Sequence, residues 1–223
     1  MKKYFRLLAY SALVLSAACS NNSSTQTTDD NSNERHLPIL GNRSAEVNYV
    51  NGQPVVDTVY QEIPDFELTN QDGQTITLKD VMGKVYVADF FFTSCPTICP
   101  VMKKEMIRVY DKFKGNKEVM ILSHTIDPDY DTKEVLRDYA KRLGADGKQW
   151  MFLTGKRSFI YSLAEKGYYA SAAADSTEPG GFVHSGGFIL VDKKLRVRGI
   201  YDGTNTQEVD KLMEDMDLLL TEK

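Results

Sequence analysis

Cysteine, histidine and tryptophan are scarce in this chain: its 223 residues include three, three and one of them, respectively. So few cysteines exclude the multi-disulfide frameworks that hold small secreted domains together. The apolar run near the N-terminus, Leu7–Leu15, is too short to span a bilayer as a permanent helix. Outside the first six residues there is no basic cluster, which speaks against nucleic-acid binding, and no internal repeat is present.

The first 18 residues are typical of a secretory signal peptide. Three basic residues lie within the first six positions, the apolar segment Leu7–Leu15 follows, and Ser16–Ala18 form a small-residue cleavage zone directly before Cys19. A cysteine at this position resembles a bacterial lipoprotein signal. We therefore expect residues 1–18 to be removed and Cys19 to carry a lipid, with an unmodified or disulfide-bonded Cys19 as the alternative.

Residues 20–35, SNNSSTQTTDDNSNER, contain no apolar side chain. Such a segment cannot build a core, so we expect residues 19–35 to form a flexible tether with a reach of roughly 20 Å. Loss of the three basic residues of the signal changes the net charge from −4 to −7 (−4 − 3). Residues 36–223 are the right length for one folded domain.

Hydrophobic periodicity predicts strands that alternate with helices in this domain. The predicted strands are residues 66–69, 74–78, 85–92, 119–126, 149–153, 183–192 and 195–201. The predicted helices are residues 96–113, a segment capped by Asp131 or Thr132 and ending at Leu143, residues 157–166 and residues 206–220. This order predicts an α/β fold with a mainly parallel sheet, a β-hairpin at 66–78 before it and an antiparallel hairpin at 183–201. Residues 171–181 are expected to form a loop.

The two remaining cysteines lie in TSCPTICP, residues 93–100, where the apolar strand VYVADFFF ends and a helix is predicted. Pro96 in the first turn would place Cys95 at the helix N-terminus, where the dipole and the N–H groups stabilise a thiolate. Cys99 would then lie one turn later on the same face. The spacing alone permits a redox pair, a metal-binding pair or a disulfide.

The three histidines differ in their surroundings. His36 lies beside the tether and is expected at the surface, whereas His124 lies in a predicted strand and is expected in the core, with a polar or metal contact as the alternative. His184 lies in the glycine-rich segment GGFVHSGGF, which leaves room around an imidazole. Two thiolates and one imidazole would form a soft site that suits Cu(I), accepts Cu(II) and is possible for zinc. A hydrogen-bonded loop histidine is the alternative for His184, and Met102 and Met106 are expected to be core residues.

Three segments in this order, TSCPTICP, TIDPDYDTKEVLRDYAKRLG and VHSGGFILVD, resemble the SCO1/SenC family, and the resemblance covers about Ile63 to Leu219. It implies a thioredoxin-like α/β fold in which helices flank a central mixed sheet, with an extra N-terminal β-hairpin. It also implies a membrane-anchored copper protein that helps to assemble the Cu(A) centre of cytochrome c oxidase. Such a role needs no enzymatic turnover.

The resemblance assigns roles to single residues. It implies that Cys95, Cys99 and His184 bind copper and that Asp127 lies just outside these ligands or acts as a weak fourth one. A turn aspartate that caps the next helix is the alternative for Asp127. Thr97 stands where family members often have an acidic residue, which makes the site less negative. The implied partner is a copper-receiving protein, such as cytochrome oxidase subunit II or another copper chaperone, and the implied location is a membrane surface facing the periplasm.

The same cysteines permit a second function, that of a thiol–disulfide oxidoreductase. Cys95 would attack a disulfide of the partner and Cys99 would resolve the intermediate, leaving a Cys95–Cys99 disulfide in the oxidised form. The usual redox spacing in this fold is C-x-x-C, which favours the copper function. A thiol peroxidase comes third because no motif places an arginine to activate peroxide.

Overall fold

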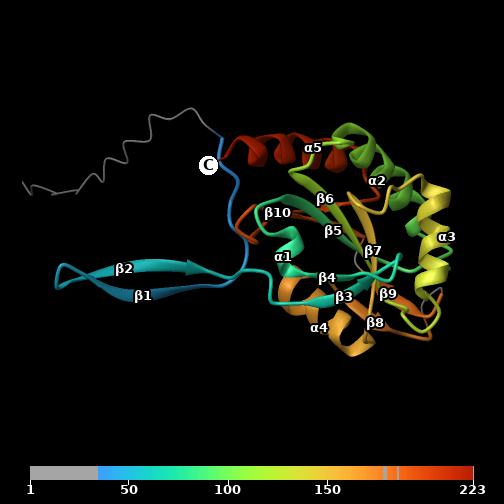
Figure 1. The fold of residues 1–223 in the computed structure, drawn as a ribbon, viewed down its shortest axis with the longest axis horizontal. Helices are drawn as coiled ribbons and strands as arrows, with labels where there is room; N and C mark the ends of the chain where they lie inside the picture. Colours follow the sequence, from blue (N-terminus) through green and yellow to red (C-terminus); the bar gives the residue numbers. More distant parts are fainter. Residues whose placement is uncertain (1–34, 178–179, 185, 223) are drawn as a thin grey trace, which may run out of the picture. The chain divides into compact units, whose positions relative to one another are not determined.

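The computed structural model describes residues 35–177, 180–184 and 186–222, and Figure 1 shows the arrangement of their helices and strands. The strands are β1 Arg43–Val50, β2 Gln53–Tyr60, β3 Glu67–Asn70, β4 Thr75–Thr77, β5 Val85–Phe91, β6 Val119–Thr125, β7 Trp150–Thr154, β8 Ala172–Ala174, β9 Phe182–His184, β10 Gly187–Val191 and β11 Val197–Asp202. The helices are α1 Leu78–Val81, α2 Cys99–Phe113, α3 Lys133–Leu143, α4 Arg157–Tyr168 and α5 Thr206–Thr221. The predicted signal peptide, Cys19 and the tether lie outside the described residues.

The central sheet has seven strands in the order β11-β10-β5-β6-β7-β3-β4. Strands β5, β6 and β7 pair in parallel, and every residue of β5 and β6 is buried, as their continuous apolar sequences predict. The strands on either side of this trio pair antiparallel. The mixed α/β class is confirmed, but the parallel part is smaller than the strand–helix alternation predicts.

Helices cover both faces of the sheet (Figure 1). On one face, Tyr139 of α3 stacks on Phe91 of β5, and α2 contributes Met102 and Met106 to the same layer. On the other face, Tyr168 of α4 packs edge-on against Phe90. Met102 and Met106 are fully buried, so their assignment to the core is confirmed.

The boundaries of α3 agree with the capping signals in its sequence. The Thr132 hydroxyl accepts a hydrogen bond from the Val135 N–H, and Gly144 ends the helix with a left-handed φ of 72°. Of the two predicted caps, Thr132 is therefore the observed one. The predicted hairpin at 66–78 is confirmed as β3 and β4, which are joined by the Asn70–Gly73 turn.

Two parts of the sheet architecture differ from the prediction. The predicted strand 183–192 is interrupted: β9 pairs with β8 in a separate two-stranded sheet, and only β10 joins the central sheet. The segment 171–181, predicted as a loop, therefore contains a short strand. The expected N-terminal hairpin at 66–78 is preceded by another, β1 with β2, for which no residue range was predicted; it turns at Asn51 and Gly52, both with positive φ, and nearly all its residues are exposed.

Candidate metal and thiol site

The cysteine motif lies in a loop beyond the carboxyl end of β5. Helix α2 begins at Cys99, not at Pro96 as predicted, and Pro100 occupies the first turn. Two prolines in this motif suit a first helical turn, and the structure uses the second. Cys95 therefore lies in the preceding loop, where its N–H donates to the Phe92 carbonyl over 3.2 Å, and both cysteines are buried as reduced thiols.

The two thiols differ in acidity. Burial alone would raise the pKa of Cys95, but hydrogen bonds from the Cys99 thiol, from the N–H groups of Cys99 and Thr97 and from the Thr97 hydroxyl outweigh it and lower the pKa. The Thr97 hydroxyl lies 3.7 Å from the Cys95 sulfur. Burial, together with the neighbouring Cys95, raises the pKa of Cys99 well above the ordinary value. Cys95 is therefore the thiol that ionises first.

A buried carboxylate holds the entrance of the cysteine loop. Asp131 is completely buried and accepts hydrogen bonds from the N–H of Thr93 at 3.1 Å, from the Thr93 hydroxyl and from the Thr125 hydroxyl at 2.5 Å. Thr93 lies two residues before Cys95, and Thr125 ends β6. Asp131 thus ties the cysteine loop to the neighbouring strand. The sequence suggested only a helix cap for Asp131, because nothing in it shows that residues 38 positions apart meet.

The segment that carries His184 packs against the cysteine loop on both sides of the histidine. Before it, a Cβ added to Gly180 would lie 2.8 Å from the Phe92 ring and 3.1 Å from Pro96. After it, a Cβ on Gly186 would lie 3.5 Å from Ile98, the residue before Cys99. The backbone of the His184 segment is therefore next to the cysteines, although the side chain of His184 is outside the described part.

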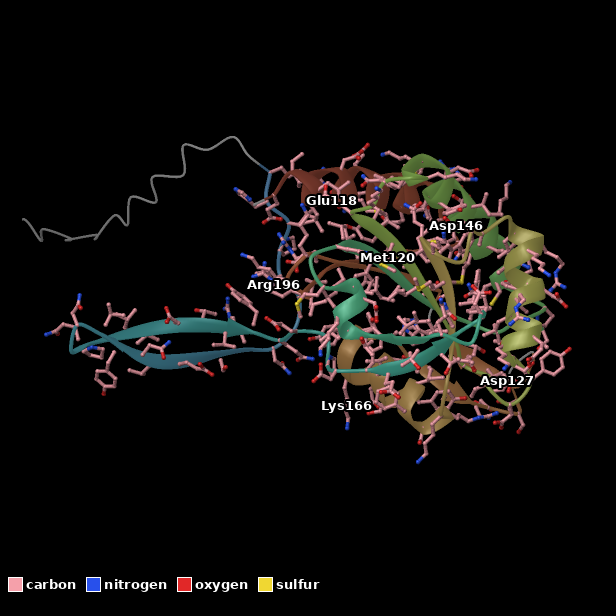
Figure 2. All side chains as sticks on the ribbon, in the orientation of Figure 1. Glu118, Met120, Asp127, Asp146, Lys166 and Arg196 are labelled. Atoms are coloured by element: carbon pink, nitrogen blue, oxygen red, sulfur yellow. The ribbon has the colours of Figure 1, made fainter. Side chains whose placement is uncertain are left out.

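Asp127 lies beyond the carboxyl end of β6 (Figure 2). Its side chain is largely buried and forms an ion pair with Arg157, from Oδ1 to Nη2 at 3.1 Å. The capping alternative for Asp127 is not observed, because Thr132 caps α3. Sequence reasoning did not single out Arg157.

A second buried carboxylate lies behind the cysteines. Asp89 of β5 and Cys99 line the same narrow, partly open pocket of about 10 Å³, and Asp89 Oδ1 accepts a hydrogen bond of 2.5 Å from Ser123. Burial raises the pKa of Asp89 to about 7, against the lowering effect of that hydrogen bond. Sequence reasoning missed Asp89 because it reads as one polar residue within an apolar strand.

The other two histidines lie where the sequence predicts. His36 is exposed. His124 is fully buried, stacks on Phe90 at 4.9 Å, and has its pKa lowered to about 4 mainly by burial. His124 is thus a core residue.

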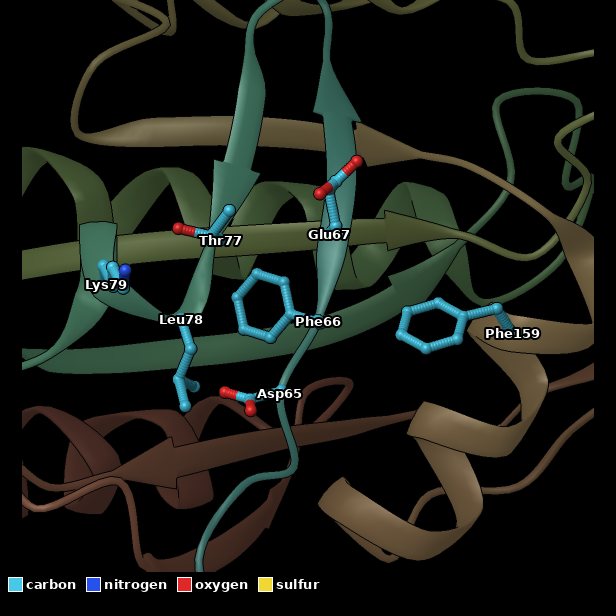
Figure 3. A pocket seen from close by; sticks show the side chains of 7 residues that line it. All are labelled: Asp65, Phe66, Glu67, Thr77, Leu78, Lys79 and Phe159. Atoms are coloured by element: carbon cyan, nitrogen blue, oxygen red, sulfur yellow. The ribbon is translucent and has the colours of Figure 1, made fainter.

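No three Cys, His, Asp or Glu side chains gather as a metal site among the described side chains, which do not include that of His184. The ligand set Cys95, Cys99 and His184 therefore stays a prediction. An open pocket of about 600 Å³ beside β3, β4 and α4, shown in Figure 3, is lined by none of the predicted site residues. In the part of the chain with assigned structure, no helix is both long and apolar enough to cross a membrane.

Comparisons with known proteins agree with this architecture. The family model SCO1/SenC matches residues 57–220. A SCO1/SenC family lipoprotein from Bacillus anthracis has a similar structure, with a TM-score of 0.66 and 31% identity over 71% of this chain and 95% of that one. BsSco, described with a disulfide switch and as a member of the Sco family of cytochrome c oxidase assembly proteins, gives a TM-score of 0.64 and 34% identity over 73% and 95%.

A third similar structure is that of Arabidopsis thaliana ScoI with copper bound. It has a TM-score of 0.59 and 25% identity over 70% of this chain and 99% of that one. The thioredoxin-like fold class expected from the sequence is confirmed by these neighbours. A family model that matches most of the chain, and a shared fold over nearly the whole length of the solved structures, show that the chain belongs to the SCO1/SenC family.

Proposed function

We propose that this protein binds a copper ion through Cys95, Cys99 and His184 and delivers it during assembly of the Cu(A) centre of cytochrome c oxidase. Copper is the cargo of this reaction, so it must be both bound and released. Cys95 and Cys99 bind as thiolates, which requires the pair to be reduced first. Asp127 lies just outside the ligands and helps to orient the segments that carry them.

One observation carries this proposal: the backbone on both sides of His184 packs against the loop that holds the two thiols. A Cβ at Gly180 would meet Phe92 and Pro96, and a Cβ at Gly186 would meet Ile98. The two sulfurs and the histidine segment thus come from distant parts of the sequence to one edge of the sheet. Two sulfur donors and one imidazole form a donor set that suits copper in either oxidation state.

The chemistry of the two thiols fits loading and release. Cys95, whose pKa is lowered, supplies the first thiolate, and Cys99, whose pKa is raised, loses its proton when the metal binds. A ligand with a raised pKa takes its proton back readily, which favours transfer of the ion to competing ligands of a partner. The similarity to Arabidopsis thaliana ScoI with copper bound supports copper as the cargo. The similarity to BsSco, a member of the Sco family of cytochrome c oxidase assembly proteins, supports delivery to the oxidase.

We further propose that a lipid on Cys19 anchors the protein to a membrane, with the folded domain facing the periplasm. The lipoprotein relative supports this anchor. Residues 19–35 would keep the domain within reach of a membrane-bound recipient, such as subunit II of the oxidase. Replacing Cys19 with Ser should move the protein from the membrane fraction to the soluble fraction; continued membrane attachment would contradict the anchor.

The copper proposal is tested by anaerobic titration of the reduced protein with Cu(I) against a competing chelator and with Cu(II) followed by absorption. We expect one equivalent of copper and a thiolate-to-Cu(II) charge-transfer band. The variants Cys95→Ser and His184→Ala should each weaken binding by at least about tenfold. Unchanged stoichiometry and affinity in H184A would contradict the assignment of His184 as a ligand.

A second candidate function, thiol–disulfide exchange, is favoured by the difference in acidity between the thiols. The Cys95 thiolate would attack a partner disulfide, forming a mixed disulfide and releasing one partner thiolate. Cys99 would then lose its proton and attack Cys95, releasing the second partner thiolate and leaving a Cys95–Cys99 disulfide. Rapid reduction of a test disulfide by protein that binds no copper would favour this function over the first.

A further inference from the structure

Arg157 joins the Asp127 turn to the strand that carries His184. It is the first residue of α4, and its side chain is one-third exposed. Its Nη2 lies 3.1 Å from Asp127 Oδ1 and 2.7 Å from Asp129 Oδ2. The guanidinium carbon lies 5.5 Å from the ring centroid of Phe182, two residues before His184.

Two side chains contact the Phe182 ring. Arg157 covers it from α4, and Phe92 packs against it with ring centroids 5.0 Å apart. Phe92 directly follows β5 and begins the loop that leads to Cys95. The three side chains therefore form a row of successive contacts, Arg157–Phe182–Phe92, with the two rings tilted by 52° to each other, and this row connects the start of α4 to the cysteine loop through strand β9.

The contacts that Arg157 makes in this row suit a planar cation. Arginine can pair with carboxylates along its edge while its face lies on an aromatic ring, whereas lysine offers only a point charge. The two carboxylates hold the guanidinium in place, so the guanidinium restricts Phe182 without being buried itself. A cation–ring contact of this kind favours the arrangement in which the Phe182 ring lies beneath the guanidinium, and β9 is only three residues long.

We propose that Arg157 is a positioning residue that holds β9 against the cysteine loop and so sets the place of His184 relative to the two thiols. The inference rests on the proposed function, because it assigns a task to Arg157 only if His184 binds copper. Cu(I) is satisfied by two thiolates, whereas Cu(II) depends more strongly on the imidazole. Loss of the contacts between Arg157 and Phe182 should therefore weaken Cu(II) binding more than Cu(I) binding.

The test compares Arg157→Met, which keeps length but removes charge and plane, with Arg157→Lys, which keeps only the charge. Arg142→Met is the matched control, since Arg142 also lies over an aromatic ring, that of Tyr139 at 5.6 Å, away from β9. We expect R157M and R157K to lower Cu(II) affinity by about tenfold or more, as losses of groups that orient metal ligands do. Cu(I) affinity should change less, and R142M should leave both unchanged.

A double-mutant cycle shows whether Arg157 acts through His184. In the His184→Ala background, R157M should cause no further loss of Cu(II) affinity, because the group it positions is gone. An equal loss in both backgrounds, or no loss in the presence of His184, would overturn the inference while leaving copper binding by Cys95 and Cys99 intact. If H184A itself bound copper like the wild type, the ligand proposal would fail, and this inference with it.

A measurement without metal gives an independent readout. Hydrogen exchange of the amides in 180–184 should be faster in metal-free R157M than in the wild type, while exchange in the cysteine loop at Thr93 stays slow. The same exchange rates at 180–184 in the two proteins would overturn the positioning role even if copper affinity fell.

Discussion

Gly180 lies directly against the ring of Phe92, so closely that a Cβ at Gly180 would approach two ring carbons to 2.8 Å. Real Cβ atoms do not come this near, so either the ring or the glycine segment would have to move. Phe92 begins the cysteine loop, and Gly180 begins the segment that leads to His184. The absence of a side chain at position 180 therefore determines how closely these two segments approach.

Replacing Gly180 with Ala should push β9 away from the cysteine loop and weaken Cu(II) binding. Gly181→Ala is the matched control, because Gly181 has nearly the same left-handed backbone, with φ of 85° against 88°, but no atom of the described residues lies within 4 Å of its Cβ position. Both variants carry a backbone strain of about 1 kcal/mol. Thermal unfolding and Cu(II) titration should show a larger loss for G180A, and equal behaviour of the two variants would contradict the steric role of Gly180.

Replacing Thr97 with Val should raise the pKa of Cys95, because the hydroxyl that hydrogen-bonds to its sulfur is lost. The rate of iodoacetamide modification of Cys95, measured against pH, reports the thiolate directly. T97V should move the midpoint to higher pH and slow the reaction at neutral pH, whereas Thr97→Ser, which keeps the hydroxyl, should not. If the pH profile of T97V overlays that of the wild type, the backbone N–H groups and Cys99 are sufficient to lower the pKa of Cys95, which would contradict the role of Thr97.

Asp131→Asn should destabilise the fold and loosen the cysteine loop. The substitution replaces one acceptor by a donor that faces the N–H and hydroxyl of Thr93 and the hydroxyl of Thr125, so it should cost about 1–3 kcal/mol. Asp129→Asn is the control, since Asp129 lies in the same turn but is exposed, and it should change stability by less than about 0.5 kcal/mol. Urea unfolding measures both, and equal losses would contradict the buried role of Asp131.

Asp89→Asn should stabilise the protein increasingly as the pH rises from about 4 to about 7. The pKa of Asp89 is about 7 in the folded state against an ordinary value of 3.8, so the folded protein holds a proton that the unfolded chain has lost over this range. The wild type therefore loses stability with rising pH through this group, by at most about 4 kcal/mol. The free energy of unfolding of D89N relative to wild type should level off above pH 7, and a pH-independent difference would contradict the raised pKa.

His124 has the opposite dependence and lies on the opposite face of the sheet. Its pKa is about 4 in the folded state against 6.5, so the unfolded chain binds the extra proton, and stability falls as the pH drops from 6.5 to 4. The advantage of His124→Phe over the wild type should therefore grow toward low pH. Below pH 6.5 the contributions of Asp89 and His124 to the free energy of unfolding change in opposite directions and partly cancel in the wild type. The single variants separate the two contributions.

Local sequence signals predicted those features that depend on local contacts. The buried run VYVADFFF, the Thr132 cap and the Asn70–Gly73 turn all appear in the structure because burial pattern, cap and turn chemistry act within a few residues. The placement of both cysteines after β5 follows from the same reasoning. The start of α2 could not be predicted in this way. Pro96 and Pro100 both suit a first helical turn, and only the folded loop determines which of them occupies it.

Contacts between distant segments were beyond local reasoning. Arg157 meets Asp127 across 30 positions, and Asp131 meets Thr93 across 38, with no spacing pattern that would reveal either pair. The break between β9 and β10 also depends on a tertiary partner, since β9 leaves the central sheet to pair with β8. The hairpin of β1 and β2 could have been found, because Asn51-Gly52 between two apolar-rich segments is a strong turn signal.

The two ends of the β1–β2 hairpin lie next to each other where they join the rest of the domain. The Gln61 N–H donates to the Asn42 carbonyl over 2.9 Å, so the chain before β1 and the chain after β2 are already in contact. The family model begins only at residue 57, inside β2. The hairpin can therefore be removed and replaced by a short linker from Asn42 to Gln61. Its tip at Asn51-Gly52 is suitable for attaching a fluorophore or an affinity tag without changing the two thiols.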